Sequence, residues 1–230
     1  MLNMITSYIH NSLIATYQSE ESKIGKDQLY QIYQDARAYN ETLFETNLSS
    51  NYNQILNYSS TKVMASIEIP VISLNIPIYH GTDDEVLNNG VGHFSFSSLP
   101  VGGKNTHCLL TGHRGLPNSK LFTRIDELKK GDLIYIHVCN KKLTYKVEKR
   151  YVIEPAQILD IKIEEGKDLL SLITCTPYGI NTKRLVVQSK RVKNKSEDKN
   201  FTRFSYSLRE LLFVMIPLVL AFIVIVRKKG

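Results

Sequence analysis

A cysteine and an arginine nine residues apart are the side chains of this sequence best suited to covalent chemistry. Cys175 ends a short apolar run that begins at Leu169, Pro177 and Gly179 interrupt the chain, and Arg184 opens a second apolar run. This pattern predicts strand, loop and strand. A cysteine thiolate is a strong nucleophile, and a fixed guanidinium can hold the oxyanion that develops when a carbonyl is attacked.

The alternation of side chains along the two predicted strands determines which residues share a face. One face would point into a core and carries Leu170, Leu172, Leu185 and Val187. Cys175 and Arg184 would then share the opposite face with Ser171 and Ile173 and flank one cleft. The alternative is that Cys175 is a buried small apolar residue, as most free cysteines are.

A base for the thiol must come from elsewhere in the chain, and His113 is the best placed of six histidines. It follows the apolar segment 106–111 and lies between Gly112 and Gly115, which end the predicted strand and expose the ring in a loop. His137 lies in the middle of a predicted strand, and the other four have no comparable setting.

These residues resemble the signature of the sortase family. The matching blocks are Thr111-Gly-His113, Leu172-Ile-Thr-Cys175 and Arg184, and the segment from Cys175 to Arg184 is similar to the form seen in class C, pilus-assembling sortases. The resemblance covers roughly Ser66 to Val192. It implies a mostly β fold, a closed eight-stranded β-barrel with short helices. It also implies a catalytic set of His113, Cys175 and Arg184, with the side chain or backbone of Thr174 assisting at the oxyanion or substrate.

The activity implied by the resemblance is that of a cysteine transpeptidase on the outer face of a Gram-positive bacterium. Such enzymes cut a Leu-Pro-X-Thr-Gly-like sorting signal after Thr, form a thioacyl link to the cysteine and pass it to an amine. For class C the amine is a lysine of a pilin subunit. A cell-wall-anchoring sortase that uses a peptidoglycan precursor amine, and a non-catalytic membrane-tethered barrel that binds a peptide, are the alternatives. No cofactor is implied.

Composition limits the remaining classes. The chain has 230 residues, enough for one catalytic domain plus short segments, and a net charge of +7 with a pI of about 9.2. Its basic residues form no stripe interleaved with aromatics, so we expect no nucleic-acid partner. The three cysteines include no close pair, and Cys108 and Cys139 lie in apolar, β-patterned runs. A zinc site built from these two with His107, His113 and His137 lacks the usual ligand spacing, so no metal is expected.

Residues 1–60 have a helical period and predict a helical arm ahead of a barrel at 61–192. Its apolar face carries Leu29, Ile32, Tyr33, Ala36, Leu43 and Phe44, and Asp27 is a plausible N-cap. Met1 to Tyr17 contains no run long enough for a membrane span and no basic region typical of a signal peptide. Class C sortases commonly carry an Asp-Pro-aromatic lid, but this chain has neither Asp nor Pro between Tyr39 and Ser66. We therefore expect Cys175 to be open to solvent, with residues 40–61 flanking the cleft or folded as helix.

Within the predicted barrel, the alternation characteristic of strands begins at Ser66. Short helices are predicted at 83–90, which ends at a glycine, and at 119–130, capped by Ser119 with an apolar stripe of Leu121, Phe122, Ile125 and Leu128. The segment 132–152 predicts a hairpin that turns at 140–142.

The C-terminal part divides into a polar tether at 193–207 and an anchor at 208–230. Sixteen consecutive apolar residues at 211–226, followed by three basic ones, predict a transmembrane helix. Six basic residues precede the span and three follow it, so the positive-inside rule alone would leave the catalytic domain in the cytoplasm. The resemblance implies an extracellular domain instead, and this is the orientation we expect.

Overall fold

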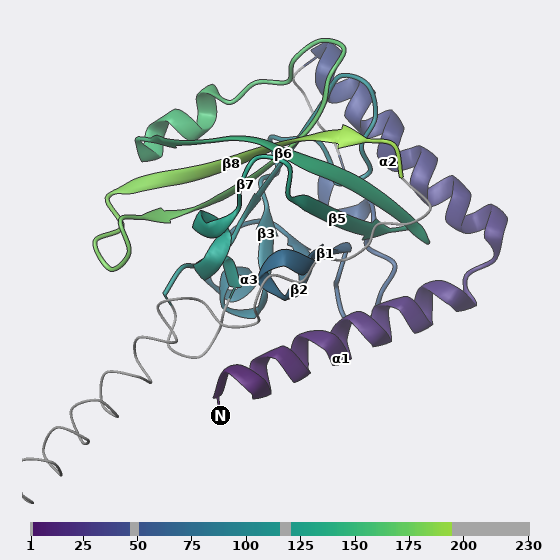
Figure 1. Ribbon diagram of the computed structural model, residues 1–230. Helices are drawn as coiled ribbons and strands as arrows, with labels where there is room; N and C mark the ends of the chain where they lie inside the picture. Colours follow the sequence, from purple (N-terminus) through teal and green to yellow (C-terminus); the bar gives the residue numbers. More distant parts are fainter. Residues whose placement is uncertain (1, 47–50, 116–120, 195–230) are drawn as a thin grey trace, which may run out of the picture.

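The computed structural model describes residues 2–46, 51–115 and 121–194 (Figure 1). The predicted anchor, most of the predicted tether and the expected cap Ser119 lie outside these residues. Among the helices of the described ranges, none combines the length and the apolar character that crossing a membrane requires.

Eight strands form a closed barrel in the order β1-β2-β3-β4-β7-β8-β6-β5, which confirms the predicted barrel. Most neighbours are antiparallel, but β2 pairs with β3 and β4 pairs with β7 in parallel. Their bounds are β1 (Ala65–Ile69), β2 (Leu74–His80), β3 (Val91–His93), β4 (Thr106–Thr111), β5 (Leu133–Val138), β6 (Lys141–Ile153), β7 (Asp168–Thr176) and β8 (Lys183–Val192).

Two long helices lie against the outside of the barrel. In Figure 1, α1 (Leu2–Lys23) runs along the bottom and α2 (Lys26–Thr46) rises along the right side. The Asn40 side chain is buried and exchanges two hydrogen bonds with the backbone of Leu99, at 2.7 and 3.2 Å, which fixes α2 to the barrel. Asp27 was predicted as the N-cap, but α2 begins at Lys26. Asp27 therefore lies in the first turn, where a carboxylate still interacts favourably with the helix dipole.

A buried polar contact joins α1 to the segment that enters the barrel. Glu21 accepts hydrogen bonds from the hydroxyl groups of Tyr17, at 3.0 Å, and Tyr58, at 2.6 Å. The Tyr17 hydroxyl also lies 3.3 Å from the carbonyl oxygen of Met64, just before β1. Burial and the neighbouring Glu21 carboxylate both raise the pKa of Tyr17, so its hydroxyl keeps the proton that it donates.

Short helices connect the strands much as the sequence predicts. The α3 helix (Asp84–Asn89) is capped by Asp83, whose carboxylate accepts from the Val86 amide at 2.9 Å, and ends at Gly90. The second predicted helix is a shorter 3₁₀ helix, η3 (Leu121–Glu127), yet all four residues of its predicted apolar stripe are buried. The β5–β6 hairpin turns at Cys139 and Asn140, with φ of 47° and 56°, rather than at 140–142. The remaining 3₁₀ helices are η1 (Tyr52–Gln54), η2 (Pro70–Ile72) and η4 (Pro155–Asp160).

The barrel interior is the main hydrophobic core, and the outer face of β4, β7 and β8 carries a second, smaller cluster. The residues predicted to face the core, Leu170, Leu172, Leu185 and Val187, all lie in the main cluster. Leu109, Ile173 and Val186 form the second cluster on the outer face, and Ile158 in η4 covers it together with nearby side chains. The inward and outward faces of β7 therefore agree with the predicted alternation.

Candidate active site

Cys175 and Arg184 lie directly opposite each other on adjacent antiparallel strands. The β7–β8 ladder pairs them one position before its last pair, Thr176 with Lys183. Residues paired in this way have side chains on the same face, here the outer face of the barrel. Both are half-buried. The ladder thus places a thiol beside a guanidinium.

The Arg184 side chain also holds the loop that connects the two strands. Its Nη1 donates to the carbonyl oxygens of Asn181, at 3.1 Å, and Lys183, at 3.0 Å. The five N–H groups of a guanidinium exceed what these two bonds use. An acceptor on a bound molecule can therefore be held without dismantling the loop.

His113 reaches the same end of the barrel on the loop that follows β4. Because β4 and β7 are parallel and pair Thr111 with Ile173, the loop leaves β4 beside the last residues of β7. The Gly112 amide donates to the Ile173 carbonyl at 3.3 Å, which extends the ladder by one bond. The amide of Phe122 in η3 donates to the His113 carbonyl at 3.0 Å. The structure thus brings His113, Cys175 and Arg184 to one site.

Thr174 lies on the inner face of β7, opposite Leu185, and is only 1% exposed. Its hydroxyl donates to the carbonyl oxygen of Gly112 at 2.8 Å. The side chain therefore holds the loop that carries His113 rather than facing the cleft. Of the two contributions predicted for Thr174, side chain or backbone, only the backbone remains close to the thiol.

Arg114 follows His113 and makes contacts in three directions. Its Nη2 lies 2.7 Å from Asp126 Oδ2 in η3, and its Nη1 donates to Thr176 Oγ1 at 3.4 Å. The guanidinium carbon lies 5.7 Å from the centre of the Tyr178 ring in the β7–β8 loop. The Arg114 side chain is 5% exposed, so this cation is buried beside the site.

A second histidine lies on the outer face of the barrel, farther along β7 from the thiol. His107 is buried, with Nε2 2.9 Å from Ser171 Oγ and Nδ1 2.9 Å from the carbonyl oxygen of Lys162. A carbonyl only accepts, so Nδ1 carries the proton and Nε2 accepts from the serine. Burial lowers the pKa of His107, which favours this neutral form. The ring thereby ties the β6–β7 connection to β4 and β7.

His107 also lines a cavity of about 690 Å³ between the end of α2 and the β6–β7 connection. Its other walls combine the apolar side chains of Leu43, Phe44, Phe96, Leu159, Ile161 and Ile163 with the polar residues Ser95, Ser97 and Lys162. Ser171, bonded to His107, is four residues from Cys175 on the same face of β7, a separation of ~13 Å at ~3.3 Å per strand residue. A short extended peptide could therefore reach from the thiol to the cavity.

Part of the segment 40–61, considered above as a possible lid, packs against the barrel near β2 and β3. The Tyr52 ring stacks on His93, with centroids 5.6 Å apart, and its hydroxyl accepts from the Gly81 amide at 3.1 Å. The His80 ring is bonded to the carbonyl oxygen of Ile55 at 2.8 Å. Residues 47–50, which complete this segment, lie outside the described ranges. Cys175 is half-buried rather than fully exposed.

The two remaining cysteines are distant from this chemistry. Cys108 and Cys139 are buried, and burial raises the pKa of both thiols, that of Cys139 to about 12. Neither can supply a thiolate at neutral pH. His137 is bonded to Glu68 at 2.9 Å. No group of three His, Cys, Asp or Glu side chains suited to a metal ion occurs in the described ranges.

Sequence reasoning missed the contacts of three residues at this site, namely Arg114, Ser171 and His107. Sequence position was a usable signal for the first two only. Arg114 adjoins the predicted base, and Ser171 shares the predicted outer face with Cys175. The pairing of His107 with Ser171 depends on the parallel β4–β7 register, which the sequence alone does not reveal.

Comparison with known proteins agrees with this geometry. The family model described as Sortase domain matches residues 67–192. Sortase D of Bacillus subtilis is 34% identical over 129 residues, which cover 55% of this chain and 62% of that protein. Sortase A of Streptococcus agalactiae is 28% identical over 192 residues, which cover 80% of this chain and 76% of that protein.

Solved structures show the same likeness over a larger part of the chain. Sortase C1 of Streptococcus agalactiae superposes with a TM-score of 0.77 at 36% identity, covering 83% of this chain and 99% of that one. Sortase C of Streptococcus pneumoniae gives a TM-score of 0.74 at 36% identity, covering 81% and 99%. With a cysteine and an arginine paired across two strands of such a barrel and a histidine loop bonded beside them, this chain belongs to the sortase family, and its structural neighbours include class C sortases.

Proposed function

We propose that this protein is a class C sortase, a membrane-anchored cysteine transpeptidase that joins a sorting-signal protein to an amine. The observation that carries the proposal is the pairing of Cys175 with Arg184 in the β7–β8 ladder, beside the loop of His113. No part of the mechanism below requires a cofactor.

In the first half-reaction the Cys175 thiolate attacks the carbonyl carbon of the threonine in a Leu-Pro-X-Thr-Gly-like signal. A C–S bond forms, and the carbonyl oxygen becomes an oxyanion that the Arg184 guanidinium stabilises, together with the backbone at Thr174. The C–N bond to glycine then breaks. His113 gives a proton to the departing amine, which leaves a thioester on Cys175.

In the second half-reaction an incoming amine attacks the thioester. His113 accepts a proton from the amine, the oxyanion forms again beside Arg184, and the C–S bond breaks to release the thiolate. The number of peptide-type bonds is unchanged, so no external energy source is needed. Holding both partners in one cleft gives transfer an advantage over hydrolysis by water.

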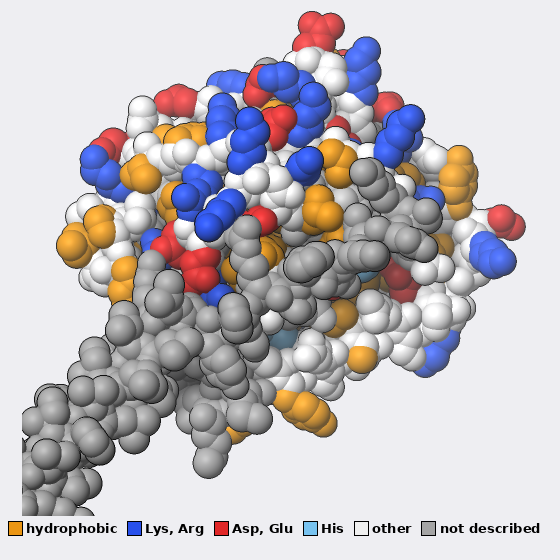
Figure 2. All heavy atoms as spheres, viewed as in Figure 1, with side chains coloured by type: hydrophobic (Ala, Val, Ile, Leu, Met, Phe, Trp, Pro, Cys, Tyr) orange, Lys and Arg blue, Asp and Glu red, His pale blue; other side chains and the backbone are white. Residues whose placement is uncertain are grey.

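The cavity beside His107 is suited to the leucine of the signal. Four residues of extended peptide span about 13 Å, the separation between Ser171 and Cys175 along β7. A threonine carbonyl at Cys175 thus places the leucine near the cavity, whose walls include Leu159 and Ile161. Figure 2 shows further hydrophobic side chains at the left end of the barrel. Tyr178 and Ile180 of the β7–β8 loop are 54% and 67% exposed, and we propose that they form an apolar rim of the cleft.

The identity of the amine is supported by the structural neighbours. One is described as sortase C1 of a pilus island, and another in terms of pilin substrate specificity. We propose a lysine of a pilin subunit as the acceptor. The second candidate is a peptidoglycan precursor amine, which sortases that anchor proteins to the cell wall would use.

The activity is tested by incubating the full chain with a Leu-Pro-X-Thr-Gly peptide and following the products by mass spectrometry. We expect cleavage after Thr and a peptide adduct on Cys175. A pilin-derived lysine peptide and a peptidoglycan-type amine, added separately, distinguish the acceptors by the mass of the product. Absence of both cleavage and adduct would favour a non-catalytic barrel that only binds peptides.

The proposed organisation comprises an arm at 1–60, the catalytic barrel at 61–192, a tether at 193–207 and an anchor at 208–230. The anchor rests on the apolar run at 211–226, and the extracellular orientation rests on sortase chemistry. Protease treatment of intact Gram-positive cells tests the orientation. Protection of the barrel from external protease would instead support the orientation given by the positive-inside count.

A further inference from the structure

The two residues that flank Cys175 are each bonded to a residue that flanks His113. On one side, Thr174 Oγ1 donates to the Gly112 carbonyl at 2.8 Å. On the other, Thr176 Oγ1 accepts from Arg114 Nη1 at 3.4 Å. Thr174 and Thr176 are two residues apart on β7, so both side chains lie on the face opposite that of Cys175. The loop is therefore held to β7 from behind the cleft.

Arg114 extends this second connection to two further elements. Its Nη2 lies 2.7 Å from Asp126 Oδ2, and η3 in turn holds the His113 carbonyl through the Phe122 amide at 3.0 Å. The same guanidinium lies beside the Tyr178 ring of the β7–β8 loop. One buried side chain thus contacts η3, the end of β7 and the β7–β8 loop.

The backbone at Gly115 leaves the space that this arrangement requires. A Cβ atom there would lie 3.0 Å from the Tyr178 ring, and Gly115 has φ of 84°, a conformation that favours glycine. The Gly115 amide is also held by Thr123 Oγ1 at 3.2 Å. The Tyr178 ring can therefore lie close against the loop of His113, near both the Arg114 guanidinium and the Gly115 backbone.

We propose that Arg114 is a positioning residue, which sets the separation of His113 and Cys175 and holds the β7–β8 loop at the edge of the cleft. It does so by bridging Asp126, Thr176 and Tyr178 with one planar cation. Lysine could replace the charge but not the several bonds at fixed angles, because its ammonium is a point charge on a flexible stem. The inference rests on the proposed transpeptidase function, since it assigns Arg114 a part in aligning that reaction.

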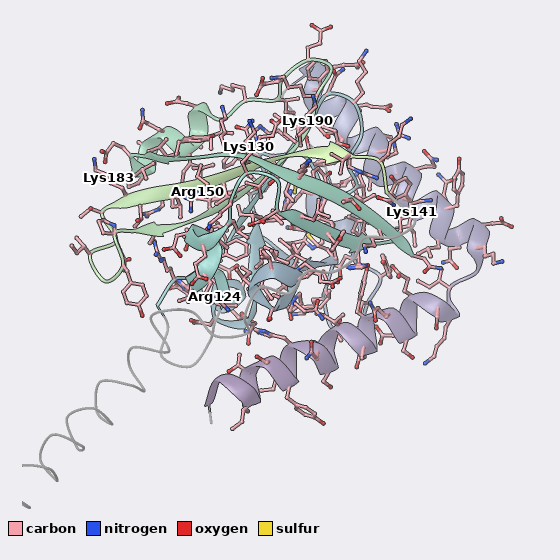
Figure 3. All side chains as sticks on the ribbon, in the orientation of Figure 1. Arg124, Lys130, Lys141, Arg150, Lys183 and Lys190 are labelled. Atoms are coloured by element: carbon pink, nitrogen blue, oxygen red, sulfur yellow. The ribbon has the colours of Figure 1, made fainter. Side chains whose placement is uncertain are left out.

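The test compares Arg114→Gln with a matched variant, Arg124→Gln, in the full chain. Arg124 is also a buried arginine of the η3 region, with Nη2 2.8 Å from Glu127 Oε2, but its Nη1 donates to the carbonyl oxygen of Ile72. Figure 3 labels Arg124, which belongs to η3, and Lys183, the first residue of β8. Both variants remove the ion pair of a buried arginine, and only Arg114→Gln removes the bridge to β7.

We expect Arg114→Gln to lower kcat for peptide transfer at least tenfold while KM changes less than threefold. Arg114→Lys should recover part of kcat, because it keeps the charge opposite Asp126. Arg124→Gln should lower the unfolding temperature yet leave kcat within twofold of the parent. Equal loss of kcat in the two glutamine variants, or unchanged kcat in Arg114→Gln, would overturn the proposal.

Hydrogen exchange provides a readout that does not depend on the reaction. In Arg114→Gln, amides of 112–115 and of 176–182 should exchange faster together, whereas Arg124→Gln should leave both segments unchanged. A parent chain with no transpeptidase activity but with this exchange pattern would refute the proposed function and leave the bridge intact. If the parent is active but Arg114→Gln exchanges at the parent's rate in both segments, the bridge is refuted and the proposed function is not.

A more conservative variant tests the proposal if Arg114→Gln does not fold. Thr176→Val removes only the acceptor on β7 and keeps the ion pair with Asp126. We expect kcat to fall three- to tenfold, with KM unchanged and with Thr176→Ser close to the parent. If kcat in Thr176→Val equals that of the parent, the bond between Arg114 and β7 has no positioning role.

Discussion

Thr174 donates a 2.8 Å hydrogen bond to the carbonyl oxygen of Gly112, which joins the residue before Cys175 to the residue before His113. The bond is buried and connects residues 62 positions apart. It crosses from β7 to the loop after β4, where regular pairing of the two strands ends. The spacing of Cys175 and His113 is therefore set by the barrel and its connecting loop.

Replacing Thr174 by valine should separate this role from simple packing. Valine has the same shape but leaves the buried Gly112 carbonyl without its donor, which costs about 1–3 kcal/mol of folding free energy. We expect kcat to fall at least tenfold, and urea unfolding to show the loss of stability. Thr174→Ser keeps the hydroxyl and is the control. A serine variant as impaired as the valine one would mean that the methyl group, rather than the hydrogen bond, matters.

Only one of the three cysteines should react readily with an alkylating reagent. Cys175 is half-buried at the cleft, whereas Cys108 and Cys139 are 3% and 4% exposed and their pKa values are raised by burial. Intact-mass measurement after brief iodoacetamide treatment at neutral pH should show a single adduct, absent from Cys175→Ala.

Alanine variants of the three cysteines distinguish a role in the reaction from a role in packing. Cys175→Ala should lose peptide cleavage and the covalent intermediate while its unfolding curve is unchanged. Cys108→Ala and Cys139→Ala should retain kcat and cost stability on the order of 1 kcal/mol or a few. Cleavage by Cys175→Ala would disprove the assigned nucleophile.

Arg184 should be sensitive to geometry as well as to charge. It lies opposite Cys175 and holds two carbonyl oxygens of its own loop. We expect Arg184→Ala to lower kcat a hundredfold or more through the lost oxyanion donor. Arg184→Lys should also be strongly impaired, because one ammonium cannot hold the loop and an oxyanion at the same time. Steady-state kinetics with a fluorogenic signal peptide measures both; full activity of the lysine variant would reduce the role to charge alone.

The stability of the barrel should fall in mild acid because of His93. This ring is buried, with Nε2 2.8 Å from the Ser98 carbonyl oxygen, and burial lowers its pKa to about 4. Below pH 6.5 the unfolded chain binds a proton that the folded ring excludes. The free energy of unfolding therefore decreases from pH 6.5 down to about pH 4, by about 2 kcal/mol at pH 5 relative to pH 7.5.

Urea titrations at pH 7.5 and pH 5 measure this contribution directly. His93→Gln removes the titrating group, so its loss of stability between the two pH values should be smaller than that of the parent. An identical loss in parent and variant would assign the acid sensitivity to other groups. His80 and His107 are candidates, because burial lowers their pKa values too.

The sequence predicts the parts of the site that lie close together along the chain. The two runs around Cys175 and Arg184 are joined by a short loop, so alternation alone is enough to place both side chains on one face. The inward residues Leu170 and Val187 agree with that alternation. Local signals also identified α3, since the glycine that ends it lies within the same few residues.

What the sequence does not predict depends on contacts between distant segments. The bonds of Arg114 to Thr176 and of His107 to Ser171 need the parallel β4–β7 register, which no local pattern encodes. The start of α2 was misjudged by two residues for a different reason, because the helix begins at Lys26 and not after Asp27. Asp27 suits an N-cap and the first turn almost equally, because both positions favour a carboxylate.

The parallel pairing of β4 with β7 also determines when the site can form. These strands are separated along the chain by the whole β5–β6 hairpin and η4, whereas β5–β6 and β1–β2 join neighbouring segments. Closing a long loop costs more chain entropy than closing a hairpin, so pairings of high contact order form late in folding. We therefore expect His113 and Cys175 to come together late in folding. A nascent or partly folded chain contains both residues, but without the β4–β7 pairing they are not held close to each other.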